Sequence, residues 1–465
     1  MLRDAVCLPV NKYFRVSTDR LIFQILSRVD GDWKPLNYDL LYVAQCVFIA
    51  DCLSPRTCIG RREFWLTIPV YEYEVWANSA ASNALQAVLE FGSGDIWSFE
   101  FIKRPDLISI TASQGCLPGM QLYVNHRVQT CLLSEGLDSL AGLTTQLLND
   151  SKSFFLATFA LIQPQCYRRV KEIVEHLNRI FGKRVILMPV VLQRSRKRFL
   201  GNEELSQRTR SFLLAITANV AALSAKSQSV SIFENGLEAF DFTTRDLMMP
   251  GDAGRPMHPI FLSRLSDFIT TLVGQPFEFR LPFLFKTKSQ MLASVTSHAH
   301  IVERTVSCIH FPRRKPGASQ CGICIGCQLR RIALRAVGLV DPDLQYDLQF
   351  DAEVIDETNH ELISTRAKFA QLTHRLQSIL EAEEPITDLL QFSGLAQKQY
   401  EELFSASARV AGIPVKCIGE HLLGLYAQFK NEYERAILLA NAYQNGNKDG
   451  LHNNNICSVS EGGVT

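Results

Sequence analysis

The chain has 465 residues, of which 47% are apolar, and Lys plus Arg total 48 against 47 for Asp plus Glu. This length is enough for two or three domains, and the apolar fraction is that of ordinary globular proteins. The near balance of charge excludes a global attraction to nucleic acid or to an anionic membrane, so neither is expected as a partner. The 13 cysteines are an odd number and mostly lie in apolar segments, which argues against a disulfide framework.

The start of the chain and its apolar segments predict a soluble, cytoplasmic protein. The first residues include Asp4 and lack a long apolar core, so they do not resemble a secretory signal. The apolar stretch 212–225 is interrupted by Thr217 and Asn219. It is also shorter than the roughly 18 residues that a membrane span needs. We therefore expect no membrane-spanning segment.

Residues 1–125 are predicted to form a β-rich α+β accessory domain. Short alternating runs at 64–70 and 97–102 are typical of strands. Residues 79–91 are the exception, because their apolar side chains recur at helical spacing. No internal repeat is visible in this part or elsewhere.

Residues 126–340 are predicted to form an α/β domain around a parallel sheet, because apolar runs alternate with amphipathic stretches. The alternating segments are 128–133, 140–148, 154–161, 167–181 and 185–192, followed by a helix at 206–225, a strand at 230–233 and a helix at 259–273.

Residues 341–442 are predicted to be a helical appendage. Phe369, Leu372, Leu376 and Leu380 are spaced as one apolar stripe. Residues 443–465 have no apolar periodicity and are expected to be disordered.

A candidate nucleotide loop lies at residues 134–139, between an apolar strand pattern and a helix pattern. Polyphosphates bind where backbone N–H groups converge at a helix start, helped by hydroxyls and by a glycine that permits close approach. Ser134, Gly136 and Ser139 supply these features, and Asp138 could hold magnesium or fix the loop. The alternative is that Ser, Gly and Asp merely cap the helix, which is common in strand-to-helix turns.

Four cysteines predict a metal site in the spacing C-x12-C-x2-C-x2-C. Four soft ligands without histidine suit a closed, structural zinc site, and an iron–sulfur cluster is the alternative. His310 is the nearest substitute ligand. The residues predicted to bind the metal are Cys308, Cys321, Cys324 and Cys327.

The loop resembles the S-G-G-x-D-S motif of PP-loop enzymes, which cleave ATP between its α and β phosphates. Its combination with T-x-x-C and C-G-x-C-x-x-C-x-L-R, here residues 305–308 and 321–330, resembles the 7-cyano-7-deazaguanine synthase (QueC-like) family. The resemblance covers about residues 127–340 and implies an adenine nucleotide alpha hydrolase-like core that uses ATP, magnesium and zinc. Glu135 departs from the motif, because the family has glycine there.

Looser resemblances add further candidate residues. Residues 208–213 and 282–290 resemble segments that line the nucleotide and substrate pockets, and Gln165 with Arg168 resembles another turn of that pocket. A longer stretch at 235–258 replaces a family loop, and Arg255 and His258 within it are candidates for substrate contacts. The resemblance implies catalytic roles for Asp138, Ser139 and Lys288, and nucleotide contacts by Ser134, Glu135, Gly136, Leu137, Asp138, Ser139 and Arg208.

The family reaction activates a carboxylate of 7-carboxy-7-deazaguanine as an adenylate, which an amine then attacks. This chain has an N-terminal domain and a helical tail in addition to the family core. In this it resembles the extended QueC-like proteins of bacterial antiphage defence clusters, which implies a protein amine as acceptor. Two alternatives remain open from the sequence. A tRNA-thiolating enzyme would need Cys131 or Cys166 as sulfur carrier, and a catalytically impaired nucleotide-binding scaffold would follow if Glu135 blocked pyrophosphate.

Overall fold

The computed structural model describes fourteen parts of the chain, and all structural statements concern these residues. Arg255, His310 and the tail from residue 445, about which the sequence makes predictions, lie outside them. The described residues are 14–16, 33–56, 61–105, 127–161, 164–194, 204, 206–241, 257–293, 295–296, 299–309, 320–339, 346–347, 360–393 and 395–444.

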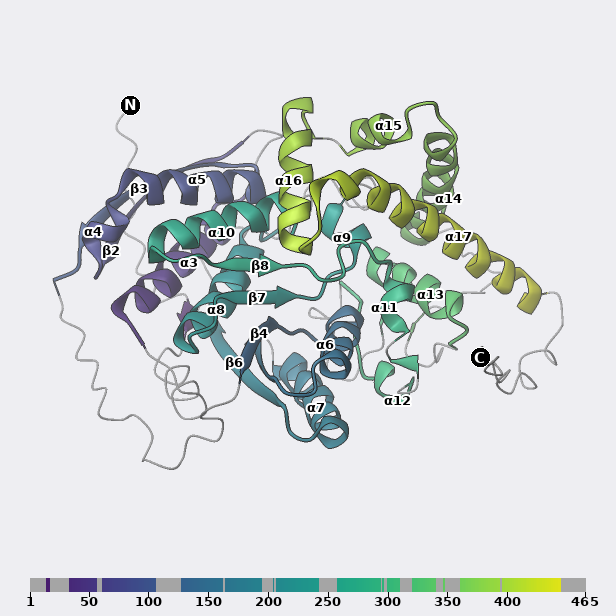
Figure 1. Cartoon of the computed structure of the whole chain (residues 1–465), viewed down its shortest axis with the longest axis horizontal. Helices are drawn as coiled ribbons and strands as arrows, with labels where there is room; N and C mark the ends of the chain where they lie inside the picture. The colour runs from purple at the N-terminus through teal and green to yellow at the C-terminus, as the bar shows by residue number, and fades with distance from the viewer. Residues whose placement is uncertain are drawn as a thin grey trace, which may run out of the picture.

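A six-stranded sheet lies at the centre of the molecule, in the order β1-β6-β5-β4-β7-β8 (Figure 1). The five strands from β6 to β8 are parallel, and β1 is antiparallel to β6. This confirms the prediction of an α/β domain with a parallel sheet. The strands are β1 (Phe14–Val16), β4 (Val128–Leu132), β5 (Phe154–Leu161), β6 (Val185–Arg194), β7 (Ser229–Ile232) and β8 (Glu278–Arg280).

Helices cover both faces of this sheet. Successive side chains of a strand point to opposite faces, so alternate residues of β5 pack into two different cores. Phe155 and Ala157 of β5 belong to the core shared with α6 (Leu137–Asn149) and α7 (Pro164–Phe181). Leu156, between them, belongs to the other core, which includes α8 (Arg210–Ser224). The chain runs outward from β4 to β6, then returns to form β7 on the other side of β4. Ligands of such sheets bind where the order reverses, at the carboxyl ends of the strands.

The N-terminal region contains more helix than was predicted. β2 (Glu63–Val70) and β3 (Ile96–Lys103) form a separate parallel pair, joined through α4 (Tyr73–Trp76) and α5 (Ser79–Ser93). The predicted helix at 79–91 is confirmed, but the β-rich description of the region is wrong for its described part. It missed α3 (Pro35–Leu53), which is apolar on nearly all sides and therefore lacks helical periodicity.

Helix α3 is long and apolar enough to cross a membrane by length and composition alone, with a mean hydropathy of 1.3, and 72% of that window is buried inside the fold. Its polar side chains are engaged internally: Asn37 donates to the Ser224 hydroxyl of α8 at 3.0 Å, and Asp39 accepts from the backbone N–H of Tyr71 at 2.8 Å. Burial with satisfied polar groups is typical of a core helix.

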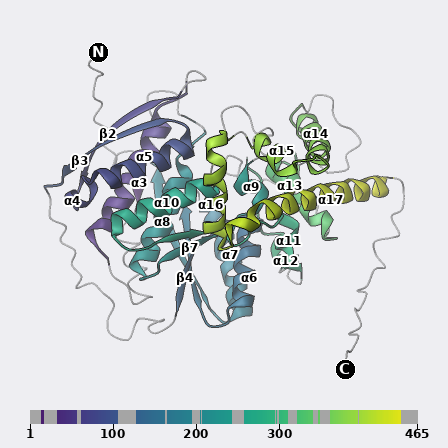
Figure 2. The ribbon, with the colours of Figure 1, turned by 45° about the horizontal axis from the view of Figure 1, so that its top comes forward.

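The helices after the sheet extend the same core. α10 (Pro259–Val273) packs on α5 and α16, and α17 packs on α13 and α14. In both views, α14, α15 and α17 lie at the opposite end of the molecule from β2 and β3 (Figures 1 and 2). The remaining helices are α9 (Gly236–Phe240), α11 (Lys288–Leu292), α12 (Ala299–Val302), α13 (Ile325–Ala336), α14 (His360–Leu380), α15 (Pro385–Phe392), η5 (Gln397–Gln399), α16 (Tyr400–Ala411), η6 (Val415–Cys417) and α17 (Ile418–Gln444).

Candidate functional site

The loop at residues 134–139 connects β4 to α6, and the hydroxyls of Ser134 and Ser139 form hydrogen bonds within it. Ser139 Oγ accepts a hydrogen bond from the backbone N–H of Ser134 at 3.1 Å and lies 2.9 Å from Ser134 Oγ. The N–H of Gly136 donates to Ser134 Oγ at 3.1 Å. Gly136 is the N-cap residue of α6, and no side chain caps this helix. The start of α6 therefore lacks the side-chain cap that the capping alternative requires. An uncapped helix start of this kind can bind anions.

A cavity of about 340 Å³ opens beside this loop, at the carboxyl ends of β4 and β7 where the strand order reverses. Its size is within the range of small-molecule sites. Two of its wall residues, Gln207 and Met257, have positive φ angles of 45° and 57°. Such backbone angles are costly for residues other than glycine and cluster at functional sites. The position, volume and backbone make this cavity the strongest candidate binding site among the described residues.

Asp138 and Lys288, both predicted as site residues, meet beneath the loop. Lys288 Nζ lies 2.7 Å from Asp138 Oδ1 and 2.8 Å from Glu238 Oε2. Asn235 Nδ2 donates to the other oxygen of Asp138 at 2.7 Å and also contacts Glu238. A third carboxylate, Glu234, lines the cavity, and oxygens of Asp138, Glu234 and Glu238 lie within 4.8 Å of one another. We call these three acids with Lys288 the loop cluster.

The loop cluster has more acidic than basic groups, and the pKa values follow from this imbalance. Burial and the neighbouring Glu238 raise the pKa of Glu234 well above its ordinary value. Burial tends to raise the pKa of Asp138, but Lys288 and the hydrogen bond from Asn235 together lower that pKa below its ordinary value. Burial tends to lower the pKa of Lys288, but the carboxylates raise it. Oxygens of Asp138, Glu234 and Glu238 lie close enough together to hold a metal ion.

Glu135, which departs from the PP-loop motif, is not among the residues that line the cavity. Burial, together with the adjacent Glu135 carboxylate, raises the pKa of the Cys166 thiol to about 12, so this carboxylate lies beside the start of α7. The backbone carbonyl of Glu135 accepts a hydrogen bond from the N–H of Val306 at 2.9 Å. The cavity wall is made by its neighbour Ser134 and by Ser139.

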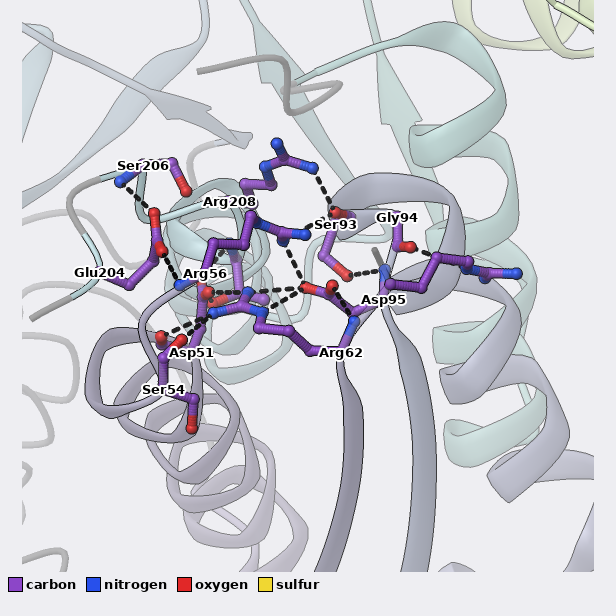
Figure 3. A network of polar contacts seen from close by, with 12 residues as sticks. Asp51, Ser54, Arg56, Arg62, Ser93, Gly94, Asp95, Glu204, Ser206 and Arg208 are labelled. Atoms are coloured by element: carbon purple, nitrogen blue, oxygen red, sulfur yellow. Dashed lines mark hydrogen bonds and ion pairs between the residues drawn. The ribbon is translucent and has the colours of Figure 1, made fainter. Parts of the chain in front are cut away.

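Arg208 lines the cavity through its place in the loop before α8, which the N-terminal region holds in position. Its Nη1 donates to the carbonyl of Ser93 at 3.1 Å. The next residue, Thr209, donates through both its N–H and its hydroxyl to Asp51 Oδ2, each at 2.9 Å. Figure 3 shows that acids and arginines of the N-terminal region and of the segment before α8 lie among one another here. We call this set the anchor network: Asp51, Arg56, Arg62, Asp95, Glu204 and Arg208.

The four predicted cysteines converge, with their sulfur atoms all within 4.8 Å of one another. Gln320 shapes one side, because its Oε1 accepts from the N–H groups of Ser307 and Cys308 at 2.8 and 3.1 Å. Gly322 has φ +79°, and a Cβ on Gly326 would lie 2.1 Å from the Ser307 carbonyl. Both positions therefore require glycine. A group of four thiols in this arrangement can bind a metal ion and is consistent with structural zinc.

The cysteine site is connected to the loop through residues 305–308. Arg330 on α13 is fully buried and donates to Thr305 Oγ1 at 2.5 Å and to the Val302 carbonyl at 2.8 Å. Val306 then donates to Glu135 in the loop. A metal that fixes Cys308 and α13 would thus hold the segment against which the loop rests.

Several other predicted contacts are absent from this cavity. Nδ1 of His258 accepts from the N–H of Ile260 at 3.2 Å, so this buried residue caps α10, and it is not among the residues that line the cavity. Arg168 lies exposed on α7, and the Gln165 side chain is outside the described residues. The sequence prediction also missed Glu234, Asn235 and Glu238. Their position directly after strand β7 was a signal, because the carboxyl ends of parallel strands share one edge.

No protein-family model matches this chain, and no curated protein matches its sequence.

Proposed function

We propose that this protein is an ATP-dependent enzyme of the PP-loop kind that adenylates a deazapurine carboxylate, such as 7-carboxy-7-deazaguanine, and transfers it to an amine. The observation that carries the proposal is the loop at 134–139. It lies at the switch point of a parallel sheet beside a cavity, and Val306 joins it to the cysteine site. The pairing of this loop with that cysteine pattern is the feature that resembles the 7-cyano-7-deazaguanine synthase family.

The chain's own residues supply the charge neutralisation that adenylation needs. The loop N–H groups and the start of α6 would receive the phosphates, and Lys288 would provide a buried positive charge nearby. Asp138, Glu234 and Glu238 would hold magnesium, which supplies further neutralisation of phosphate charge when bound.

The reaction needs no protein nucleophile. A carboxylate oxygen of the purine attacks the α phosphorus, and the bond to the β phosphate breaks as pyrophosphate leaves. The amine nitrogen then attacks the acyl carbon, AMP leaves with the bonding electrons, and the amine loses a proton. Positioning and exclusion of water are therefore the main demands on the cavity.

Two observations weigh against the alternatives. A sulfur-carrying cysteine must form a thiolate, but burial raises the pKa of Cys131 to about 12, and Cys166 has a similarly raised pKa. An inactive scaffold was suggested by Glu135, whose carboxylate lies beside Cys166 instead of in the cavity wall.

The acceptor is tested by mass. Purified protein is incubated with ATP, magnesium, 7-carboxy-7-deazaguanine and either ammonium or a co-encoded protein, and products are measured by mass spectrometry. A purine adduct on the protein would support a protein amine as acceptor in an antiphage system. AMP release without any added mass on that protein would reject this acceptor, and the absence of nucleotide turnover would reject the enzyme proposal itself.

A further inference from the structure

Two short helices carry charges of the loop cluster, and neither is long enough to be stable alone. Glu238 lies on α9 and Lys288 is the first residue of α11, and each of these helices has five residues. Isolated helices of this length are unstable in water, so other parts of the fold must fix their positions. Lys288 Nζ lies 2.7 Å from Asp138 and 2.8 Å from Glu238. A displacement of α11 by about 1 Å would break these contacts.

Helix α17, which the proposed reaction does not use, lies beside α9 in both views (Figures 1 and 2). Leu425 of α17 packs against Gly236, the first residue of α9, where an added Cβ would lie 2.5 Å from Leu425 Cδ2. The N–H of Gly236 donates to the Lys286 carbonyl at 2.9 Å, which joins the start of α9 to the segment before α11. The position of α17 therefore affects both short helices.

A hydrogen bond joins α17 to the residue before Lys288. Thr287 is the N-cap of α11, and its hydroxyl donates to Oε1 of Glu432 on α17 at 2.7 Å. The same hydroxyl oxygen accepts from the backbone N–H of Gln290 at 3.2 Å, which closes the first turn of α11. Because the hydroxyl has one proton and that proton goes to Glu432, its oxygen is left to accept from Gln290. Glu432 thus orients the cap that begins α11.

Both partners of this hydrogen bond are buried. Glu432 is 7% exposed, and Thr287 is fully buried. Gln428, one turn earlier on α17, donates to the same oxygen of Glu432 at 2.7 Å. Both donors to this oxygen are neutral, and burying a carboxylate is costly unless its hydrogen bonds are made. The bond from Thr287 is therefore favoured, and it holds the start of α11 to α17.

We propose that Glu432 is a positioning residue for Lys288, which it holds in place through the Thr287 hydroxyl. In this way α17 fixes the Lys288 ammonium between the carboxylates of Asp138 and Glu238. Glu432 and Thr287 do not line the cavity, so they act only through Lys288. The effect on catalysis rests on the proposed function, in which Lys288 neutralises phosphate charge. The helical region is then a part of the active site.

The link itself is tested by hydrogen–deuterium exchange of the full-length protein, measured by mass spectrometry without nucleotide. Glu432→Ala removes the acceptor, and Thr287→Val removes the donor without any change in α17. We expect each variant to speed exchange in residues 287–292 about tenfold, because the capped first turn of α11 opens more often. Glu432→Gln keeps an oxygen that accepts the same bonds, so its exchange should match wild type.

Glu420→Ala is the matched control, because Glu420 is an exposed acid in the first turn of the same helix. It should leave exchange in residues 287–292 unchanged. Unchanged exchange in either Glu432→Ala or Thr287→Val would overturn the proposal. Faster exchange that extends equally through α17 would also overturn it, because Glu432 would then act on the helix as a whole.

The catalytic consequence is measured as AMP release with ATP, magnesium, ammonium and 7-carboxy-7-deazaguanine, corrected for the folded fraction. Glu432→Ala should lower kcat about thirtyfold and leave the KM for ATP within about twofold, since a displaced Lys288 neutralises less charge in the transition state. Glu432→Gln should restore kcat to within about threefold of wild type. A rise in KM alone, or equal losses in the two variants, would overturn the positioning role.

The two measurements separate this inference from the proposed function. If wild type releases no AMP, the proposed function fails, and exchange alone decides whether Glu432 holds α11. If wild type releases AMP and Glu432→Ala keeps its kcat, the positioning role fails and the proposed function stands.

Discussion

The loop cluster and the anchor network are two groups of partly buried charges that differ in their balance. In the anchor network three acids meet three arginines, and Arg62 alone contacts both Asp51 and Asp95 at 2.5 and 2.6 Å (Figure 3). In the loop cluster three acids meet one lysine, Lys288.

The pKa values record this difference. Burial tends to raise the pKa of Asp95, but Arg62 outweighs it and the pKa is lowered. The pKa of Glu204 is lowered to about 2, since the hydrogen bonds from Ser206 and Arg56 outweigh its partial burial. In the loop cluster the pKa values of Glu234 and Glu238 are raised, chiefly by burial. In a balanced network each carboxylate is paired with a cation, whereas an excess of partly buried carboxylates leaves capacity for a further cation.

The largest expected effect comes from removing the central acid of the loop cluster. Asp138→Ala should lower ATP-dependent pyrophosphate release about a thousandfold, because it removes both a magnesium ligand and the partner of Lys288. The fold should persist, since Lys288 keeps Glu238. Pyrophosphate is measured by a coupled enzymatic assay, with the exposed Asp267→Ala as control. A rate within tenfold of wild type would remove Asp138 from the mechanism.

The cysteine site is joined to the loop through the bond from Val306 to Glu135, so its loss should act on the loop. Cys327→Ser should reduce zinc content from about one ion per chain to nearly none. The free energy of unfolding should fall by more than about 4 kcal/mol, as loss of a structural metal does. Elemental analysis and denaturant unfolding measure the two quantities. Cys417→Ser is the matched control, because the half-buried Cys417 is outside the cluster. Iron instead of zinc in the purified protein would contradict the zinc assignment.

Removing an acid from the anchor network should act on stability first. Asp51→Ala leaves the Thr209 N–H and hydroxyl without their acceptor and removes one of the carboxylates of Arg62. We expect the free energy of unfolding to fall by about 3 kcal/mol. Denaturant unfolding measures this, and pyrophosphate release is corrected for the folded fraction. A loss of release as large as that of Asp138→Ala, without loss of stability, would break the distinction between the two clusters.

The smallest effect is a pH dependence from Glu234. Because its pKa in the folded state lies above its value in the unfolded chain, the protonated form stabilises the fold at low pH. That contribution is lost as the pH rises through the raised pKa. Glu234→Gln should remove this pH-dependent loss of stability. The Tm of the variant should therefore exceed that of wild type by roughly 2 °C on the alkaline side and match it near pH 4. Calorimetry across pH without divalent cations measures the difference, and a gap that narrows with rising pH would contradict the sign.

The elements around the sheet could be predicted from the sequence where burial is one-sided or where a strand is short and continuous. The predicted helix at 259–273 is α10, and the predicted strand at 154–161 is β5. Helix α3 could not be found in this way, because an all-round apolar helix has no periodicity to detect. Its partner residues come from distant parts of the chain, such as Ser224.

The candidate site could be predicted only where its residues form a local pattern. The loop at 134–139 and the four cysteines are spaced motifs, and the structure brings each set together. Glu238 contacts Lys288 although 50 residues of chain separate them, a relation that no local spacing encodes. Arg208 was predicted as a nucleotide contact. Its hydrogen bond to the Ser93 carbonyl could not be predicted, because the two residues are 115 positions apart in the chain.

The identity of the nucleotide product shows whether the loop directs cleavage of ATP between the α and β phosphates. Wild-type protein is incubated with ATP, magnesium and ammonium, with and without 7-carboxy-7-deazaguanine, and the products are separated by anion-exchange chromatography. The account predicts AMP and pyrophosphate in equal amounts, formed only when the purine carboxylate is present. ADP with phosphate, or no turnover of ATP, would contradict it.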